Sequence, residues 1–347
     1  MRSPWTQFLA DAGARYEGNR LCDFGDAEYE ARAALEGDVI TDLSHVALIG
    51  VKGKDAGEFL ARQFTNEITA IGQKRTGLGA WCTPKGRVIV LFRLFRWGHS
   101  YYLLIPADPL QTTLHRLQKY VLRSDVHLDD ASDKLVRIGL SGPNTPELLA
   151  KGSREIPEEP DAVSQTPDLV IMRIVGPHPR FLLTGAREAI QDCWRTVQRQ
   201  ATAVGPDSWA LLDILSGLPM VTREISEEFV PQMLNLHRLG GLSFTKGCYP
   251  GQEVIARLKY RGQLKRRMYL ALSDTNGIPR PGTKLYAGSA SGSSVGQVVS
   301  AARYPEGTTA LLAVIEISAA TGADIVLGAP GGPSLRIQDF PYSPDDG

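Results

Sequence analysis

Short apolar runs alternate with amphipathic stretches along the first two-thirds of the chain. Buried strands are predicted at residues 45–51, 77–83, 87–97 and 101–106. Apolar residues recur at helical spacing in 54–68 and again near 108–121, which predicts two helices. Further strands are predicted at 135–143, 169–175 and 180–185, with a helix at 186–200. This alternation indicates a mixed α+β body.

Two further segments of the body give clear local signals: one is predicted to be a loop and the other a capped helix. Residues 152–168 are rich in Pro, Glu and Ser and are predicted to form a surface loop. The N-terminal segment is predicted to be a short helix, because Ser3 suits the N-cap and Pro4 suits the first helical position.

From about residue 265 the pattern changes to short β-type runs. They read RRMYLALS, GTKLYAG, SVGQVVSA, TTALLAVIEI and ADIVLG. Turn pairs such as Asn276-Gly277, Pro281-Gly282 and Glu306-Gly307 separate them. We therefore predict a small all-β domain, a barrel or a sandwich, followed by a loose tail at PYSPDDG.

Composition narrows the class of protein. The chain has 347 residues, 43% of them hydrophobic and 22% charged, as expected for a soluble globular protein of two or three domains. Lys plus Arg equals Asp plus Glu, at 38 each, so a general attraction to nucleic acid is not indicated and any basic site must be local. No apolar run approaches the ~18 residues that span a membrane, and a cytoplasmic location is expected.

The four cysteines, Cys22, Cys82, Cys193 and Cys248, form no CxxC pair. Their spacing favours reduced thiols in a cytosol and argues against a self-contained zinc or iron–sulfur site. We therefore expect no stably bound metal.

One cysteine lies in an unusual setting, the octet KGCYPGQE at 246–253. A helix is predicted to start near Pro250, to bury Val254, Ile255 and Leu258, and to end at Gly262. Cys248 would then precede a helix N-terminus, and both the helix dipole and a nearby ammonium favour a thiolate. A lone cysteine is more often a small buried hydrophobic residue, so both interpretations stay open.

Basic residues follow the octet. They are Arg257, Lys259, Arg261, Lys265, Arg266 and Arg267. They form either a solvated helix face with a linker or a local anion site for a carboxylate tail or a few phosphates.

The octet resembles the signature of the YgfZ-type folate-binding proteins. The resemblance extends over 212–269, over GVKGKDAGEFLARQFTNEI at 50–68 and over WCTPKGRVIVLFRLFRW at 81–97. The wider superfamily includes the T protein of the glycine cleavage system. It implies an α+β fold in which two mixed α/β lobes surround a folate-sized central hole, with a small C-terminal β-barrel.

The resemblance also suggests domain boundaries. The N-terminal lobe is expected at 1–130, completed by 217–262, the second lobe at 131–216 and the barrel at 263–347.

The function that the resemblance implies is that of an accessory protein. It would bind tetrahydrofolate or a derivative, and it would support the assembly or repair of iron–sulfur clusters in partner enzymes and thereby tRNA modification. Cys248 would be the working thiol and Lys246 would keep it ionised, in a loop formed by Gly247, Tyr249, Gly251, Gln252 and Glu253. The expected folate contacts are Trp209, Arg223, Glu224, Gln232, Arg257 and Arg261. Glu253 either complements the helix dipole or receives donors from a flat heterocycle, and Trp209 is either a stacking platform or a core residue.

Two alternatives stay open. The first is a tetrahydrofolate-dependent aminomethyl or one-carbon transferase. Against it, Val88–Leu91 and Leu215 occupy positions where such enzymes carry acids, and a thiol replaces the acid of their KGDF-type motif. A second family tryptophan is absent near Val46. Asp213 and Glu224 are the carboxylates that remain as candidates. The second alternative is a binding module that contacts tRNA or a protein through the basic run.

Overall fold

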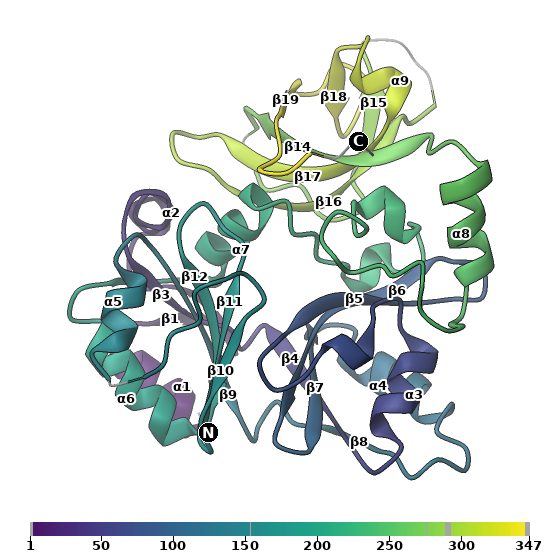
Figure 1. The fold of residues 1–347 in the computed structure, drawn as a ribbon. Coiled ribbons are helices and arrows are strands. Elements are labelled where there is room, and N and C mark those ends of the chain that lie inside the picture. The colour runs from purple at the N-terminus through teal and green to yellow at the C-terminus, as the bar shows by residue number, and fades with distance from the viewer. Residues whose placement is uncertain (1–2, 153, 276, 289–292, 344–347) are drawn as a thin grey trace.

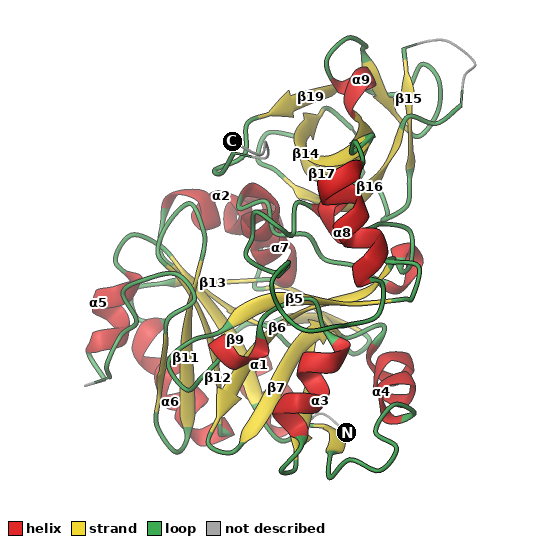
Figure 2. Cartoon of the chain, turned by 45° about the vertical axis from the view of Figure 1, so that its right-hand side comes forward, coloured by secondary structure: helices red, strands yellow, loops and turns green. Residues whose placement is uncertain are grey.

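The structure is a computed structural model that describes residues 3–152, 154–275, 277–288 and 293–343. Two α/β lobes lie side by side, and a third, C-terminal sheet is stacked across one end of both (Figure 1). The view in Figure 2 shows the same arrangement, with α8 (Gln252–Arg261) standing between the first lobe and the C-terminal sheet.

The first lobe is built on an antiparallel sheet. Its strands are β4 (Val46–Lys52), β5 (Gly77–Cys82), β6 (Val88–Trp97), β7 (Ser100–Pro106) and β8 (His127–Asp130), in the order β5-β6-β7-β4-β8. Helices α3 (Ala56–Gln63) and α4 (Leu110–Gln118) cover one face, and the 3-10 turn η1 (Ile68–Ala70) follows α3. Phe59 and Leu114 of these helices share a core with Ile49 and Leu103 of the strands. The apolar stripe of each helix therefore faces the sheet.

The second lobe has a mixed sheet. Its strands are β3 (Val39–Asp42), β9 (Val136–Ser141), β10 (Val163–Gln165), β11 (Leu169–Ile174), β12 (Arg180–Gly185) and β13 (Thr202–Val204), in the order β10-β11-β12-β9-β3-β13. Only the β3–β13 pair is parallel among the described strands of this sheet. The accompanying elements are α1 (Pro4–Asp11), the hairpin β1 (Arg15–Glu17) and β2 (Arg20–Asp23), α2 (Ala27–Glu36), α5 (Thr145–Ala150), α6 (Arg187–Val197) and α7 (Pro206–Leu215).

The start of the chain belongs to the second lobe rather than to the first. Strand β3 pairs with β9 and β13, and Trp5 and Leu9 of α1 share a core with Trp194 of α6. The two sheets pack against each other through side chains such as Leu48 and Met172. The boundaries drawn from the sequence remain a prediction, and strand pairing places residues 39–42 in the sheet of the second lobe.

The C-terminal sheet has the order β18-β15-β16-β17-β14-β19. Its elements are β14 (Arg266–Ser273), β15 (Lys284–Ala287), β16 (Gly296–Arg303), β17 (Thr309–Glu316), α9 (Ile317–Ala320), β18 (Ile325–Leu327) and β19 (Leu335–Gln338). A β-bridge between Val326 and Ser334 joins the two ends of the sheet. This closure makes the sheet a small barrel, as expected from the turn-rich sequence.

A connecting segment ties the three sheets together. It contains the 3-10 turns η2 (Arg223–Ile225) and η3 (Pro231–Leu234) and leads into α8. Phe229 and Leu234 share a core with Val88 of the first lobe and Met268 of the barrel. Because one hydrophobic core crosses all these parts, the position of each lobe constrains the others.

Most elements predicted from hydrophobic periodicity are confirmed, including the capped α1, in which the Ser3 Oγ accepts a hydrogen bond from the Thr6 N–H at 3.1 Å. The surface loop predicted at 152–168 is wrong at its end, where β10 pairs with β11. The predicted loose tail is also wrong at Tyr342, whose hydroxyl donates to the Gly217 carbonyl at 3.1 Å. Asn276 of a predicted turn, and residues 344–347 of the tail, lie outside the described residues.

The two glycines of the KGCYPGQE octet differ in the space around them. Gly251 is the N-cap of α8, with φ +83°, and a Cβ there would lie 2.6 Å from both the Gly86 Cα and the Thr83 carbonyl oxygen. A Cβ on Gly247 would have no heavy atom within 4 Å. Only Gly251 therefore combines a left-handed conformation with close contact to the β5–β6 turn.

We expect Gly251→Ala to lower the free energy of unfolding by about 2 kcal/mol or more, because it adds both backbone strain and a clash with backbone atoms. Gly247→Ala is the matched control and should change the free energy of unfolding by less than about 0.5 kcal/mol. Urea unfolding of both variants measures the difference. Equal stability of the two variants would contradict this account of the turn contact.

Candidate functional site

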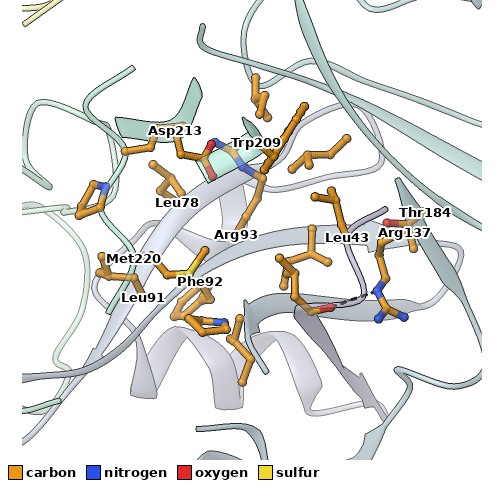
Figure 3. A pocket seen from close by; sticks show the side chains of 18 of the residues that line it. Leu43, Leu78, Leu91, Phe92, Arg93, Arg137, Thr184, Trp209, Asp213 and Met220 are labelled. Atoms are coloured by element: carbon orange, nitrogen blue, oxygen red, sulfur yellow. Dashed lines mark hydrogen bonds between the residues drawn. The ribbon is translucent and has the colours of Figure 1, made fainter. Parts of the chain in front are cut away.

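A cavity of about 120 Å³ lies where the two lobes and α7 meet. Figure 3 shows side chains from both sheets converging on it. Its apolar wall is formed by Leu43, Val46, Leu78, Leu91, Phe92, Leu104, Ile105, Pro106, Ile174, Leu182, Leu183, Leu218, Pro219 and Met220. Trp209, Arg93, Arg137, Thr184 and Asp213 complete the lining. An apolar cavity with a few convergent polar groups is the usual form of a small-molecule site.

The polar corner of this cavity is organised by a buried arginine. Arg180 is fully buried, and its guanidinium donates to Asp213 Oδ1 at 2.8 Å and to Ser216 Oγ at 3.2 Å. The guanidinium carbon also lies 4.1 Å from the ring centroid of Trp209. Asp213 and Trp209 come from one helix and Arg180 from a neighbouring strand, so these contacts join α7 to β12.

Asp213 is the one carboxylate of the cavity lining, and its side chain keeps 20% of its exposure. Burial raises the pKa of this carboxyl, while the positive charges of Arg180 and Arg93 oppose the rise. Burial also lowers the pKa of Arg180, and Asp213 opposes that shift. The carboxylate is thus held in place by one arginine and has a second, Arg93, close by.

The structure distributes the expected folate contacts over three regions. Trp209 borders the central cavity. Arg223 and Glu224 are exposed in η2, where the Arg223 backbone N–H donates to Asp108 Oδ2 at 2.6 Å. Gln232 lies beneath α8 and donates to the Ile255 carbonyl at 2.6 Å. Arg257 and Arg261 lie on α8 itself. Of the six expected folate contacts, only Trp209 therefore lines the cavity, and folate contacts of the other five residues stay predictions.

Two positions singled out from the sequence do border the cavity. Leu91 and Val46 contribute to its wall, where the resemblance placed an acid and a second tryptophan in related proteins. Arg93 and Arg180 are polar residues of the site that sequence reasoning missed. Both lie on strands among buried apolar residues. A charged side chain within a buried strand needs a partner, and this is the sequence signal that could have identified them.

The KGCYPGQE loop forms a second candidate site, away from the cavity lining. Cys248 is exposed, and α8 begins four residues after it, two residues later than the start predicted near Pro250. Ile255 is buried and Leu258 half-buried, but Val254 is 39% exposed, so the predicted apolar face is narrower than expected. The Gly86 turn of the β5–β6 hairpin lies against this helix beside Val254 and Ile255.

Lys246 anchors the loop to the first lobe. Its ammonium donates to the carbonyl oxygens of Ala61 at 2.6 Å and Phe64 at 2.5 Å, at the end of α3, and lies 5.2 Å from the ring centroid of Tyr249. Burial lowers the pKa of Lys246 to about 8. The ammonium is thus hydrogen-bonded to backbone carbonyl groups. Its expected role in keeping Cys248 ionised stays a prediction.

The remaining octet residues shape the loop. Tyr249 is buried in the central core, and burial raises the pKa of its hydroxyl. The Gln252 side chain donates to the Lys246 carbonyl at 3.4 Å. Glu253 forms an ion pair with Arg257 at 2.6 Å, one turn later. The loop therefore presents Cys248 from a scaffold that is fixed on both sides.

Some residues of the basic run have partners within the chain, and others are exposed. Arg257 is bound by Glu253, Arg266 is bound by Glu316 at 2.6 Å, and Arg267 donates to the Tyr269 hydroxyl at 3.0 Å. Lys259 lies 3.8 Å from the ring centroid of Phe244, while Arg261 and Lys265 are exposed.

Two kinds of feature are absent from the described residues. Within 3–152, 154–275, 277–288 and 293–343, no group of three His, Cys, Asp or Glu side chains could hold a metal ion. In the same part of the chain, every helix is too short or too polar to cross a lipid bilayer.

Comparison with known proteins decides the family. Residues 13–167 match the family described as the GCVT N-terminal domain. The chain is 31% identical over 305 residues to the tRNA-modifying protein YgfZ of Yersinia pestis (strain Pestoides F), covering 88% of this chain and 92% of that protein. The chain belongs to the YgfZ family.

A further YgfZ relative supports this assignment, and one solved structure shares the fold. The tRNA-modifying protein YgfZ of Hamiltonella defensa is 34% identical over 244 residues, which is 70% of this chain and 72% of the relative. The glycine cleavage system aminomethyltransferase T from Bartonella henselae superposes with a TM-score of 0.77 over 99% of this YgfZ-family chain and 98% of its own. At 15% identity that likeness shows a shared fold and nothing about activity.

Proposed function

We propose that this chain is a tetrahydrofolate-binding accessory protein that supports the assembly or repair of iron–sulfur clusters and thereby tRNA modification. One observation carries the proposal: an apolar cavity bordered by Trp209 lies apart from an exposed cysteine on the fixed KGCYPGQE loop. The first suits a flat ligand, and the second suits contact with another protein.

The chemistry of the cavity fits a reduced folate. A pterin is a flat heterocycle with an apolar face and hydrogen-bond donors along one edge. Trp209 borders the cavity with a ring that is 2% exposed and carries the Arg180 guanidinium on one face, and Asp213 offers a carboxylate acceptor that Arg180 holds in position. Apolar side chains such as Leu91 and Val46 would exclude water from the bound ring.

We expect the purified chain to bind tetrahydrofolate with a change in tryptophan fluorescence. Trp209→Phe should weaken binding by about tenfold, because a smaller ring loses stacking area in the cavity. Trp194→Phe, at a fully buried tryptophan in α6 outside the cavity lining, is the matched control and should bind as the wild type does. Equal affinities of all three proteins for tetrahydrofolate would show that Trp209 does not contribute to the binding site.

The thiol of Cys248 is the proposed point of action on client proteins. A single thiolate cannot hold an iron–sulfur cluster, so it would ligate a cluster together with cysteines of a partner or exchange with a partner thiol. The contacts of Lys246 and Gln252 keep the loop in one conformation. Client iron–sulfur enzymes would supply the remaining ligands.

In a strain that lacks its own YgfZ-family gene, Cys248→Ser should fail to restore iron–sulfur-dependent tRNA thiolation, since it keeps the side-chain size and removes the thiolate. Cys22→Ser, at a half-buried cysteine of β2, should restore it like the wild type. The measurement is the fraction of thiolated tRNA nucleosides. Full restoration by Cys248→Ser would rule out thiol chemistry at this residue.

The basic run that follows Cys248 is a better contact surface for client proteins than for RNA. Arg257 and Arg266 are already bound by carboxylates of this chain, which reduces the positive charge offered to phosphates. The exposed Tyr260 on the same helix adds an apolar contact of the kind found at protein interfaces.

Asp213 favours a second candidate function, a tetrahydrofolate-dependent one-carbon transferase, because it places a carboxylate in the cavity wall. Its ion pair with Arg180 and the apolar cavity wall, which includes Leu91, argue that this carboxylate binds a ligand rather than taking part in a reaction. We therefore expect no formation of methylenetetrahydrofolate when the chain is mixed with tetrahydrofolate and an aminomethyl donor. Turnover that depends on the chain would establish the transferase instead.

A further inference from the structure

A cleft of about 860 Å³ lies between the first lobe and the C-terminal barrel, and we call it the barrel cleft. One wall comes from the β5–β6 turn and the connecting segment, and the other comes from β15, β16 and β17. The linker at 263–265, between α8 and β14, and the start of α9 complete the lining. Figure 2 shows α8 between these two parts of the molecule. Over the described residues, the barrel cleft shares no lining residue with the central cavity, so it is a separate site.

Cationic side chains outnumber carboxylates in the lining of the barrel cleft. The carboxylates are Glu228 and Glu316, and the cations are Arg87, Lys265, Arg266 and Lys284. Arg266 binds Glu316 at 2.6 Å, which neutralises one charge of each sign. Within the part of the chain that the structure describes, the other three cations form no ion pair, so the cleft keeps a surplus of positive charge.

Neutral acceptors hold two of these cations, one on each wall. The Lys284 ammonium donates to Gln297 Oε1 at 2.6 Å, and Gln297 is only 9% exposed on the neighbouring strand β16. On the wall of the first lobe, the Arg87 guanidinium donates to the Glu228 carbonyl oxygen at 2.6 Å. An amide or carbonyl oxygen orients a cation without neutralising it, so both charges remain available to an anionic ligand.

The number of unpaired cations favours linked phosphates over simpler anions. A monocarboxylate can neutralise one of the three, whereas two or three linked phosphates carry enough charge for all of them. Both the arginine fork and the lysine ammonium are common phosphate ligands in proteins. The volume of the cleft lies within the range of about 300–1,000 Å³ that is usual for small-molecule sites. A nucleic acid is a poorer fit, because the chain as a whole has no net charge and this surplus is confined to a cleft.

We infer that the barrel cleft binds a small molecule with two or three linked phosphates, either a nucleotide or an inorganic polyphosphate. This inference is independent of folate binding in the central cavity and of thiol chemistry at Cys248. Such a ligand would contact the first lobe through Arg87 and the barrel through Lys284. It would therefore join these two parts of the molecule across the linker that follows α8.

The first test is isothermal titration calorimetry of the full chain at low salt, with tripolyphosphate, ATP and AMP as probes. We expect tripolyphosphate and ATP to bind at least about tenfold more tightly than AMP, because they carry more charge, and we expect added salt to weaken both. Tighter binding of ATP than of tripolyphosphate would identify a nucleotide as the ligand. Equal or weaker binding of ATP would identify an inorganic polyphosphate.

Variants of the lining test which residues hold the phosphates. Lys284→Ala and Arg87→Ala should each weaken tripolyphosphate binding by about tenfold, while Arg87→Lys, which keeps the charge but not the fork, should retain part of the affinity. Gln297→Glu keeps the side-chain shape but places a carboxylate against Lys284, and it should weaken binding as much as Lys284→Ala does. Lys119→Ala, at an exposed lysine after α4 and outside the cleft, is the matched control and should bind as the wild type does.

Three results would overturn the inference. The first is failure of tripolyphosphate and ATP to bind, or binding no tighter than that of AMP. The second is unchanged affinity in Lys284→Ala and Arg87→Ala; both residues are exposed, and urea unfolding shows whether the variants stay folded. The third comes from a tRNA transcript as a competitor. If it binds more tightly than tripolyphosphate, displaces it and depends on the same two residues, the cleft is part of an RNA surface instead.

Discussion

A buried arginine holds the central cavity in shape. Arg180 has no exposure to solvent, so its charge is tolerable only because Asp213, Ser216 and the face of Trp209 surround it. These contacts fix α7 against β12 and set the position of the tryptophan ring. The ring in turn requires Gly139 opposite, where a Cβ would lie 2.6 Å from a ring carbon. The shape of the cavity therefore depends on one ion pair and one glycine.

The second candidate site is fixed by a different kind of contact. Lys246 satisfies two carbonyl groups at the end of α3, which otherwise lack helical partners. The loop that carries Cys248 is thereby tied to the first lobe, and Gly251 brings α8 against the β5–β6 turn. The lobes, the barrel and the loop share one core, so a ligand in the cavity and a partner at the thiol would act on a single body.

Much of the fold was accessible from the sequence, and the reasons differ by element. The first-lobe strands β4, β5, β6 and β7 are apolar runs of six to ten residues, so periodicity identified them. The four-residue, largely polar β8 was missed, and so was β10, which is three residues long and pairs with β11. The helix that follows the octet was predicted from local signals, although it starts at Gln252 rather than near Pro250. The Arg180–Asp213 pair was not predicted, because it joins residues 33 positions apart through tertiary packing. The contacts of Lys246, 182 positions from Phe64, were hidden for the same reason.

A crystal structure of the chain with bound tetrahydrofolate would test the central claim most directly. The account predicts that the pterin lies in the central cavity against Trp209, within hydrogen-bond distance of Asp213, while Cys248 stays exposed and makes no contact with the ligand. A pterin bound beside Cys248, with the central cavity empty, would contradict it.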